Sequence, residues 1–146
     1  MEAPLNIDST NKKIKLDFKD SKYATGRRKK SIAKVWLKKG SGIISVNGKK
    51  MVDYFKKPNL QNAICRPLTL IKRENEFDVR CSVKGGGFSG QAGAIMHGIA
   101  RVLVQFEPDL KPALKKEKLT TRDSRAVERK KYGHRKARRS FQFSKR

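Results

Sequence analysis

The feature that most constrains the fold is a glycine-rich turn, Lys84–Gly93 (KGGGFSGQAG), set between two segments of different periodicity. Upstream, apolar and polar residues alternate along Phe77–Val83, which is the period of a half-buried strand. Downstream, apolar residues along Phe88–Phe106 recur at steps of three and four, which places them on one face of a helix. The sequence therefore predicts a strand, a tight turn and a long amphipathic helix in direct succession.

Three of these glycines, Gly85, Gly87 and Gly90, have the G-x-G-x-x-G spacing of a dinucleotide-binding loop. Such a loop belongs to a unit in which a second parallel strand follows the helix and ends in an acidic residue. Here the helix is followed by Pro108, Pro112 and a lysine-rich run, with no apolar strand. We therefore expect no nucleotide cofactor. The glycines are expected to provide left-handed turn angles and close packing, or to present amide groups to an anion at the helix N-terminus; the two roles are compatible.

The rest of the chain predicts further short elements. They are strands at Ser31–Lys38 and Ile43–Val46, which a turn at residues 40–42 joins, a helical turn at Val52–Phe55, and a helix that begins at Pro58. Pro67 is expected to end or kink that helix. The order of strands and helices predicts an α+β fold, with a sheet and helices packed on one of its faces.

Charge points to the class of partner. The chain has 37 Lys and Arg against 13 Asp and Glu, a net charge of +24. Residues 122–146 alone carry a net charge of +9 in 25 residues, about three times the charge density of the rest. Such a field attracts polyanions, of which nucleic acid is the first candidate. A membrane partner is not expected, because the sequence has neither a long apolar run nor a basic segment with a broad apolar stripe.

Composition also divides the chain into three regions. Residues 1–21 mix acidic residues with lysines, hold no arginine and have no apolar core; they are expected to be a flexible extension rather than a secretory signal or a mitochondrial presequence. Residues 22–119 are predicted to form the globular body. Residues 120–146 are predicted to be an extended basic tail, because their few apolar residues cannot form a core without a partner.

The candidate RNA-binding residues are the cations and amides best placed to hold phosphates. They comprise the cations beside Gly26, the start of the glycine turn and the basic tail: Arg27, Arg28, Lys29, Lys30, Lys84, Gly85, Gly86, Arg122, Arg125, Arg129, Lys130, Lys131, Arg135, Lys136, Arg138 and Arg139. Trp36 shares a strand face with Lys34 and Lys38. It is expected to cover a neighbouring element, with base stacking as the alternative.

No catalytic or metal site is expected. Cys65, Cys81, His97 and His134 are scattered and lack the spacing of zinc ligands. Cys81 is expected to be a small buried side chain and His97 a packed or RNA-facing imidazole. No Ser, Cys or carboxylate stands at a telling distance from either histidine, so neither an enzymatic reaction nor a small-molecule substrate is predicted.

Five segments resemble one known family. They are Tyr23–Trp36 (YATGRRKKSIAKVW), Ile44–Lys49 (ISVNGK), Val83–Ile95 (VKGGGFSGQAGAI), Thr121–Gly133 (TRDSRAVERKKYG) and Lys136–Arg146 (KARRSFQFSKR). Together they resemble the family of the ninth small-subunit ribosomal protein, of bacterial and organellar type, and most closely its alphaproteobacterial and mitochondrial branch. The resemblance covers all but about the first 20 residues. Met96 departs from it, since many members have arginine there.

The resemblance implies a ribosomal S-five-domain-two-like α+β fold and a structural role in the small ribosomal subunit. It implies binding to the rRNA of the head, in the 3′ major domain, beside neighbouring head proteins. It also implies that the tail reaches the peptidyl-site tRNA, which Ser144, Lys145 and Arg146 would contact. The implied location is the ribosome, in either the bacterial cytoplasm or the mitochondrial matrix.

Overall fold

The computed structural model describes residues 19–145, and its centre is a five-stranded mixed sheet. The strands are β1 (Lys22–Arg28), β2 (Ser31–Lys39), β3 (Ile44–Val46), β4 (Lys49–Lys50) and β5 (Phe77–Lys84), in the order β1-β2-β5-β3-β4. Nearly all of the predicted N-terminal extension, together with Arg146, lies outside the described residues.

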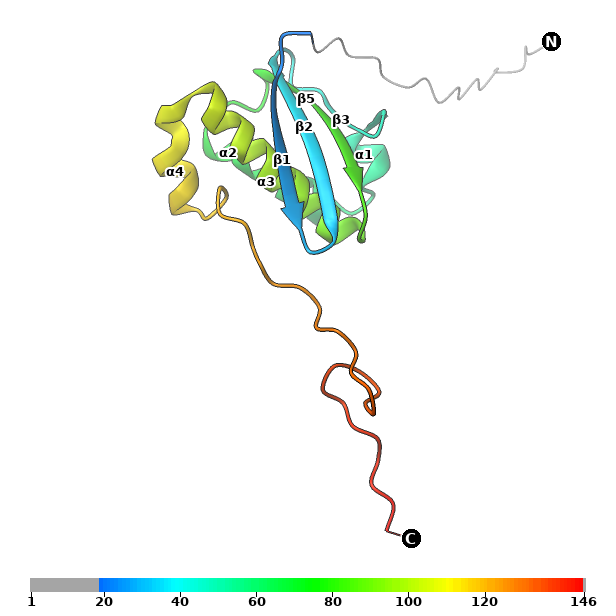
Figure 1. Ribbon diagram of the computed structural model, residues 1–146. Coiled ribbons are helices and arrows are strands. Elements are labelled where there is room, and N and C mark those ends of the chain that lie inside the picture. Colours follow the sequence, from blue (N-terminus) through cyan, green and yellow to red (C-terminus); the bar gives the residue numbers. More distant parts are fainter. Residues whose placement is uncertain (1–18, 146) are drawn as a thin grey trace, which may run out of the picture.

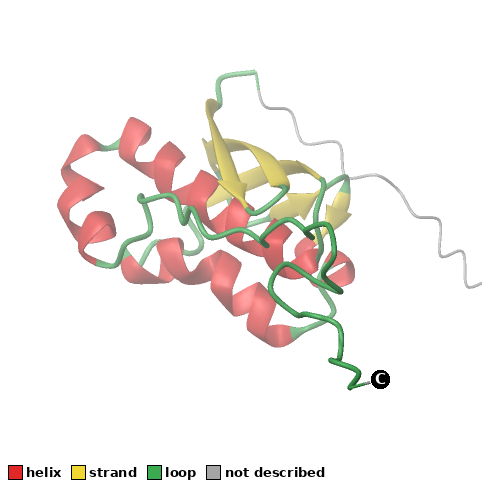
Figure 2. Ribbon diagram, turned by 60° about the horizontal axis from the view of Figure 1, so that its bottom comes forward, coloured by secondary structure: helices red, strands yellow, loops and turns green. Residues whose placement is uncertain are grey.

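The helices lie on one side of this sheet (Figures 1 and 2). They are α1 (Met51–Tyr54), α2 (Pro58–Leu70), α3 (Phe88–Phe106), a 3-10 turn (Pro108–Leu110) and α4 (Lys111–Lys116). Helix α3 packs along β1 and β2, and α2 packs against α3. None of the helices in residues 19–145 is long and apolar enough to cross a membrane. The predicted α+β architecture is confirmed, and α3 has the bounds that its periodicity predicts.

The core forms between the sheet and α3 because two periodicities meet there. Strands β2 and β5 alternate, so that every second side chain points toward the helix. The residues buried in this layer are Ala33, Val35, Leu37, Phe77, Val79, Cys81 and Val83 from the strands, and Ala92, Ile95, Ile99, Val102 and Leu103 from α3. Cys81 is thus a buried apolar side chain, as predicted, and burial raises the pKa of its thiol.

Two glycines allow α3 to cross β1 at close range. A β-carbon added to Gly26 in β1 would overlap the carbonyl oxygen of Ala94 and the amide nitrogen of Gly98, both in the α3 backbone. It would also lie 2.8 Å from the Gly98 α-carbon. Because backbone atoms cannot rotate away as side chains do, no larger residue fits at position 26 without moving the helix from the strand.

Strand β1 is not among the strands that the sequence predicts, the first of which begins at Ser31. In the structure β1 runs through Thr25–Arg28 and pairs antiparallel with β2. Its core-facing side is made by Ala24 and Gly26, which are too small to give the apolar signal of a strand. The apolar signal of β1 is weak because only small residues fit where α3 crosses the strand so closely.

The strand after the turn at residues 40–42 is β3, and its neighbour in the sheet is not the strand that precedes the turn. It does not return beside β2: β5 lies between them, and β3 pairs with β5 in parallel. The connection from β3 to β5 passes through α1 and α2, which is the helical crossover that parallel neighbours require. Local periodicity identified the strand, whereas its position depends on pairing with a segment more than 30 residues away.

One helix prediction needs correction. Helix α2 continues to Leu70, three residues past Pro67, where the prediction ended or kinked it. The lost hydrogen bond is offset by burial, because Pro67 and Leu68 both lie in the interior. The lysine-rich run beyond Pro108, for which the sequence predicts no strand, forms α4, which buries Leu114 while its lysines face outward.

Candidate nucleic-acid interface

Two cationic turns meet at one end of the sheet. One is the β1–β2 turn, Arg28–Ser31, in which Lys29 has a φ of 50°. The other is the β5–α3 turn that begins at Lys84, which is the cross-strand partner of Ile32. A β-carbon on Gly85 would lie only 2.5 Å from the carbonyl oxygen of Lys30, so the two turns are in contact.

The glycine turn owes its sequence to backbone geometry. Gly85 and Gly86 have φ angles of 77° and 63°, in the left-handed region that favours glycine. The Ser31 hydroxyl donates to the Gly85 carbonyl at 2.9 Å, and a β-carbon on Gly86 would overlap that same hydroxyl. By contrast, Gly87 has open space around it. The backbone therefore requires glycine at positions 85 and 86 because of their left-handed φ angles. These positions differ from the spacing of a dinucleotide-binding loop, which would require glycine at position 87.

The root of the tail is fastened to the same end of the sheet by Asp123. Its carboxylate pairs with Arg28 on β1 and accepts a hydrogen bond from the Arg125 guanidinium at 2.8 Å. Hydrogen bonds from Arg125, and then the pairing with Arg28, hold the pKa of Asp123 well below its usual range. Asp123 was not singled out from the sequence, although an acid flanked by Arg122 and Arg125 in so basic a segment was a usable signal.

His97 fastens the chain just before that point. Its Nδ1 accepts a hydrogen bond from the backbone N–H of Arg27 at 3.3 Å, and its Nε2 lies 3.2 Å from the carbonyl oxygen of Thr120. Because an N–H can only donate, Nδ1 carries no proton and Nε2–H donates to Thr120. His97 is only 8% exposed, and burial, with Arg101 and Arg122 nearby, lowers its pKa. His97 is thus a packed imidazole that joins β1, α3 and the tail root.

Acidification is expected to loosen this root. A histidine whose pKa is lowered by folding contributes stability above the unfolded pKa of about 6.5 and loses it as the pH falls. Between pH 7.5 and 5.5 the free energy of unfolding should fall, with a slope of at most about 1.4 kcal/mol per pH unit from this group. Urea unfolding at several pH values measures this pH dependence of the free energy of unfolding. His97→Gln should flatten the dependence and His134→Gln, in the exposed tail, should not; equal slopes in all three proteins would contradict this role.

The predicted RNA-binding residues separate into two groups in the structure. The residues at the cationic end are Arg27, Arg28, Lys29, Lys30, Lys84, Gly85, Gly86, Arg122 and Arg125. Those farther along the tail are Arg129, Lys130, Lys131, Arg135, Lys136, Arg138 and Arg139, followed by Ser144 and Lys145 near its end. The tail runs from the cationic end away from the body (Figure 1).

One carboxylate folds part of the tail into a loop. Glu128 accepts two hydrogen bonds from the guanidinium of Arg138, at 2.8 and 2.9 Å, and this pairing lowers the pKa of Glu128. The backbone N–H of Arg135 also donates to the carbonyl of Arg139 at 2.8 Å, and Gly133 has a φ of 72°. Arg138 is therefore committed to a partner within the chain, as Arg28 is.

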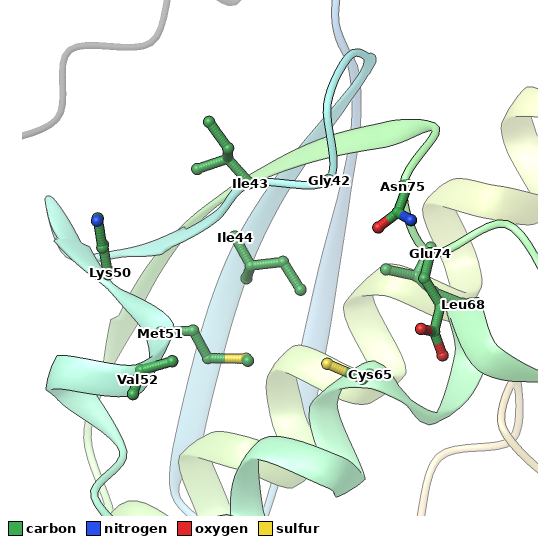
Figure 3. Close-up of a pocket in the computed structure, with 10 residues that line it drawn as sticks. All are labelled: Gly42, Ile43, Ile44, Lys50, Met51, Val52, Cys65, Leu68, Glu74 and Asn75. Carbon is green, nitrogen blue, oxygen red and sulfur yellow. The ribbon is translucent and has the colours of Figure 1, made fainter.

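A hollow of about 640 Å³ lies elsewhere, between β3, α1 and α2 (Figure 3). Ile44, Met51, Cys65 and Leu68 line it, with Glu74 at its rim. Burial, and then Glu74, raises the pKa of the Cys65 thiol, which keeps it protonated and a poor nucleophile. Within residues 19–145 no three His, Cys, Asp or Glu side chains gather as metal ligands would.

A known protein family matches most of the chain. The family model described as ribosomal protein S9/S16 matches residues 26–146. The match begins at the glycine under α3, and it includes both cationic turns, the tail root and the whole tail.

Proposed function

The chain belongs to the ribosomal protein S9/S16 family, and we propose that its cationic end anchors it on rRNA in the head of the small subunit while its tail reaches the peptidyl-site tRNA. Family membership itself makes the protein a structural, non-enzymatic component of the ribosome that binds small-subunit rRNA and neighbouring ribosomal proteins. Its place in the head and the contact with tRNA are the proposed part.

One observation carries the anchoring proposal: segments far apart in the sequence converge at one cationic end. The turn at Lys29 and Lys30, the turn at Lys84 and the tail root at Arg125 lie together there. Cations and backbone amides placed together in this way suit the phosphates of a folded RNA, which are set by its shape rather than its sequence. Arg27, Lys29 and Lys30 are exposed and suited to direct phosphate contact, whereas Arg28 acts through Asp123 by holding the tail root.

The division into a body at residues 22–119 and a tail at residues 120–146 is part of the proposal. Leu119 is the last fully buried residue along the chain in the described part, and the next residue, Thr120, is held by His97. Beyond it an extended chain covers at most about 3.3–3.6 Å per residue, so the tail can reach tens of ångströms into RNA. That reach allows the end of the tail to approach a tRNA that the body does not touch.

Deleting Ser144–Arg146 is expected to leave subunit assembly intact and to speed dissociation of peptidyl-site tRNA about tenfold. Two exposed cationic contacts, each worth roughly 1 kcal/mol, are lost, although the α-carboxylate offsets part of their charge. The measurement is the tRNA off-rate on small subunits that carry the shortened protein.

Two further proteins sharpen that test. Lys145→Gln combined with Arg146→Gln keeps the chain length and should also speed dissociation, whereas Lys136→Gln, earlier in the tail, should not. An unchanged off-rate with normal assembly would leave the tail as an rRNA anchor only. The rRNA that co-purifies with the protein identifies its ribosome as bacterial or mitochondrial and tests the proposed branch.

A further inference from the structure

The face of the sheet opposite the helices carries an aromatic and cationic surface that runs across three strands. Tyr23 in β1 pairs across the strands with Trp36 in β2, which in turn pairs with Arg80 in β5. The Tyr23 and Trp36 rings lie 5.3 Å apart at 44°, and the Arg80 guanidinium lies 5.7 Å from the centre of the Trp36 ring. We call these three residues the aromatic row.

The next rows of this face are mostly polar and cationic. Lys34 lies between Thr25 and Ser82, and the row beyond it holds Arg27 and Lys84 on either side of Ile32, which is exposed. Arg27 and Lys84 belong to the cationic end described above, so the aromatic row is continuous with the proposed rRNA anchor. On the other side of the aromatic row lies an acidic residue, Asp78. Its carboxylate accepts hydrogen bonds from the backbone N–H groups of Ser41 and Ile43, both at 2.9 Å.

Burial of the aromatic row is incomplete. Tyr23 is 43% exposed and Trp36 is half-buried, while Arg80 and Lys34 are exposed. Within residues 19–145 every helix lies on the other side of the sheet (Figure 2). Large aromatic rings left on a sheet surface, with cations beside them, have the chemistry that stacks unpaired bases and holds their phosphates.

We propose that this face binds an unpaired rRNA nucleotide, whose base stacks on Tyr23 and Trp36 while Arg80 and Lys34 hold adjacent phosphates. The inference rests on the proposed rRNA binding and adds a class of ligand, a single-stranded segment, to it. Charge complementarity favours RNA over a protein neighbour, since the exposed charged side chains around the row, among them Lys34, Lys38 and Arg80, are cationic. The site also differs from the cationic end in kind, because stacking is insensitive to salt whereas phosphate contacts are not.

Trp36 provides a direct test because it is the only tryptophan in the chain. Full-length protein is titrated at about 200 mM salt with a single-stranded oligoadenylate of about twelve nucleotides, and separately with a duplex RNA of the same phosphate count. The single strand is expected to quench the tryptophan fluorescence at saturation, and the duplex to bind with little quenching. Stacking is tolerant of sequence, so a generic strand is a fair probe.

Variants separate stacking from charge. Tyr23→Leu and Trp36→Leu should each weaken single-strand binding about tenfold with an unchanged salt dependence. Lys34→Gln combined with Arg80→Gln should lower the salt dependence instead. Phe88→Leu is the matched control, since Phe88 is a 60% exposed aromatic outside this face and should have no effect. Urea unfolding confirms that each variant is folded.

The outcomes are distinguishable. If no RNA binds at all, the proposed function itself fails. If RNA binds without quenching, and Tyr23→Leu and Trp36→Leu bind normally, the cationic end is supported and the stacking surface is overturned. If Trp36 fluorescence changes only in assembled subunits and not with RNA, a neighbouring protein covers this face, and the stacking proposal is again overturned.

Discussion

Gly26→Ala is expected to destabilise the body by about 3 kcal/mol or more, enough to unfold a marginally stable domain in the absence of RNA. The added methyl group would overlap the carbonyl oxygen of Ala94 and the amide nitrogen of Gly98. Relief requires α3 to move away from β1, and that movement opens the core along the whole helix. Urea unfolding followed by far-ultraviolet circular dichroism measures the change in the free energy of unfolding.

Gly87→Ala is the matched control for this prediction. Gly87 precedes α3 with a φ of −106°, and a β-carbon there meets nothing within 4 Å. The same chemical change should therefore cost only a few tenths of a kcal/mol, the cost of a poorer helix cap. If the two variants were equally stable, the close crossing of β1 and α3 would not be the reason for glycine at position 26.

The sequence predicted the elements whose signals are local. Helix α3 and strand β5 were predicted because their apolar residues repeat regularly over many positions, and the glycine turn marked the junction between them. Strand β1 was missed because its core side is made of Ala24 and Gly26, and small residues give almost no apolar signal. The neighbour of β3 was missed because its partner, β5, is distant in the sequence, and periodicity carries no information on pairing.

The candidate interface was predictable as a set of charges but not as an arrangement. The number of cations marks the turns and the tail as candidate RNA-binding segments. It does not reveal that Arg28 is paired with Asp123 or that Arg138 is paired with Glu128. Both pairings depend on where the chain lies in space. His97 gave no useful signal either, because its two partners are backbone groups of Arg27 and Thr120, and backbone groups are the same in every sequence.

The affinity of the full chain for rRNA is expected to fall a thousandfold or more between 50 and 200 mM salt. This follows if the exposed cations neutralise roughly six to ten phosphates, because each neutralised phosphate releases bound counterions. Filter binding of small-subunit rRNA across this range of salt gives the slope of log affinity against log salt. An affinity indifferent to salt would contradict a phosphate-dominated interface.

The structure predicts that the position of the cations, and not only their number, determines the affinity for rRNA. Arg27→Gln, Lys29→Gln and Lys30→Gln together should reduce the slope by about two, since each lost phosphate contact contributes about 0.7–0.9. The matched control is Lys111→Gln, Lys115→Gln and Lys116→Gln on α4, which removes the same charge from exposed positions apart from the β1–β2 turn (Figure 1). If only the general field mattered, the two triple variants would lose affinity equally. If the turn variant alone loses affinity and has a smaller salt slope, phosphates must bind at the end of the sheet where the two cationic turns and the tail root converge.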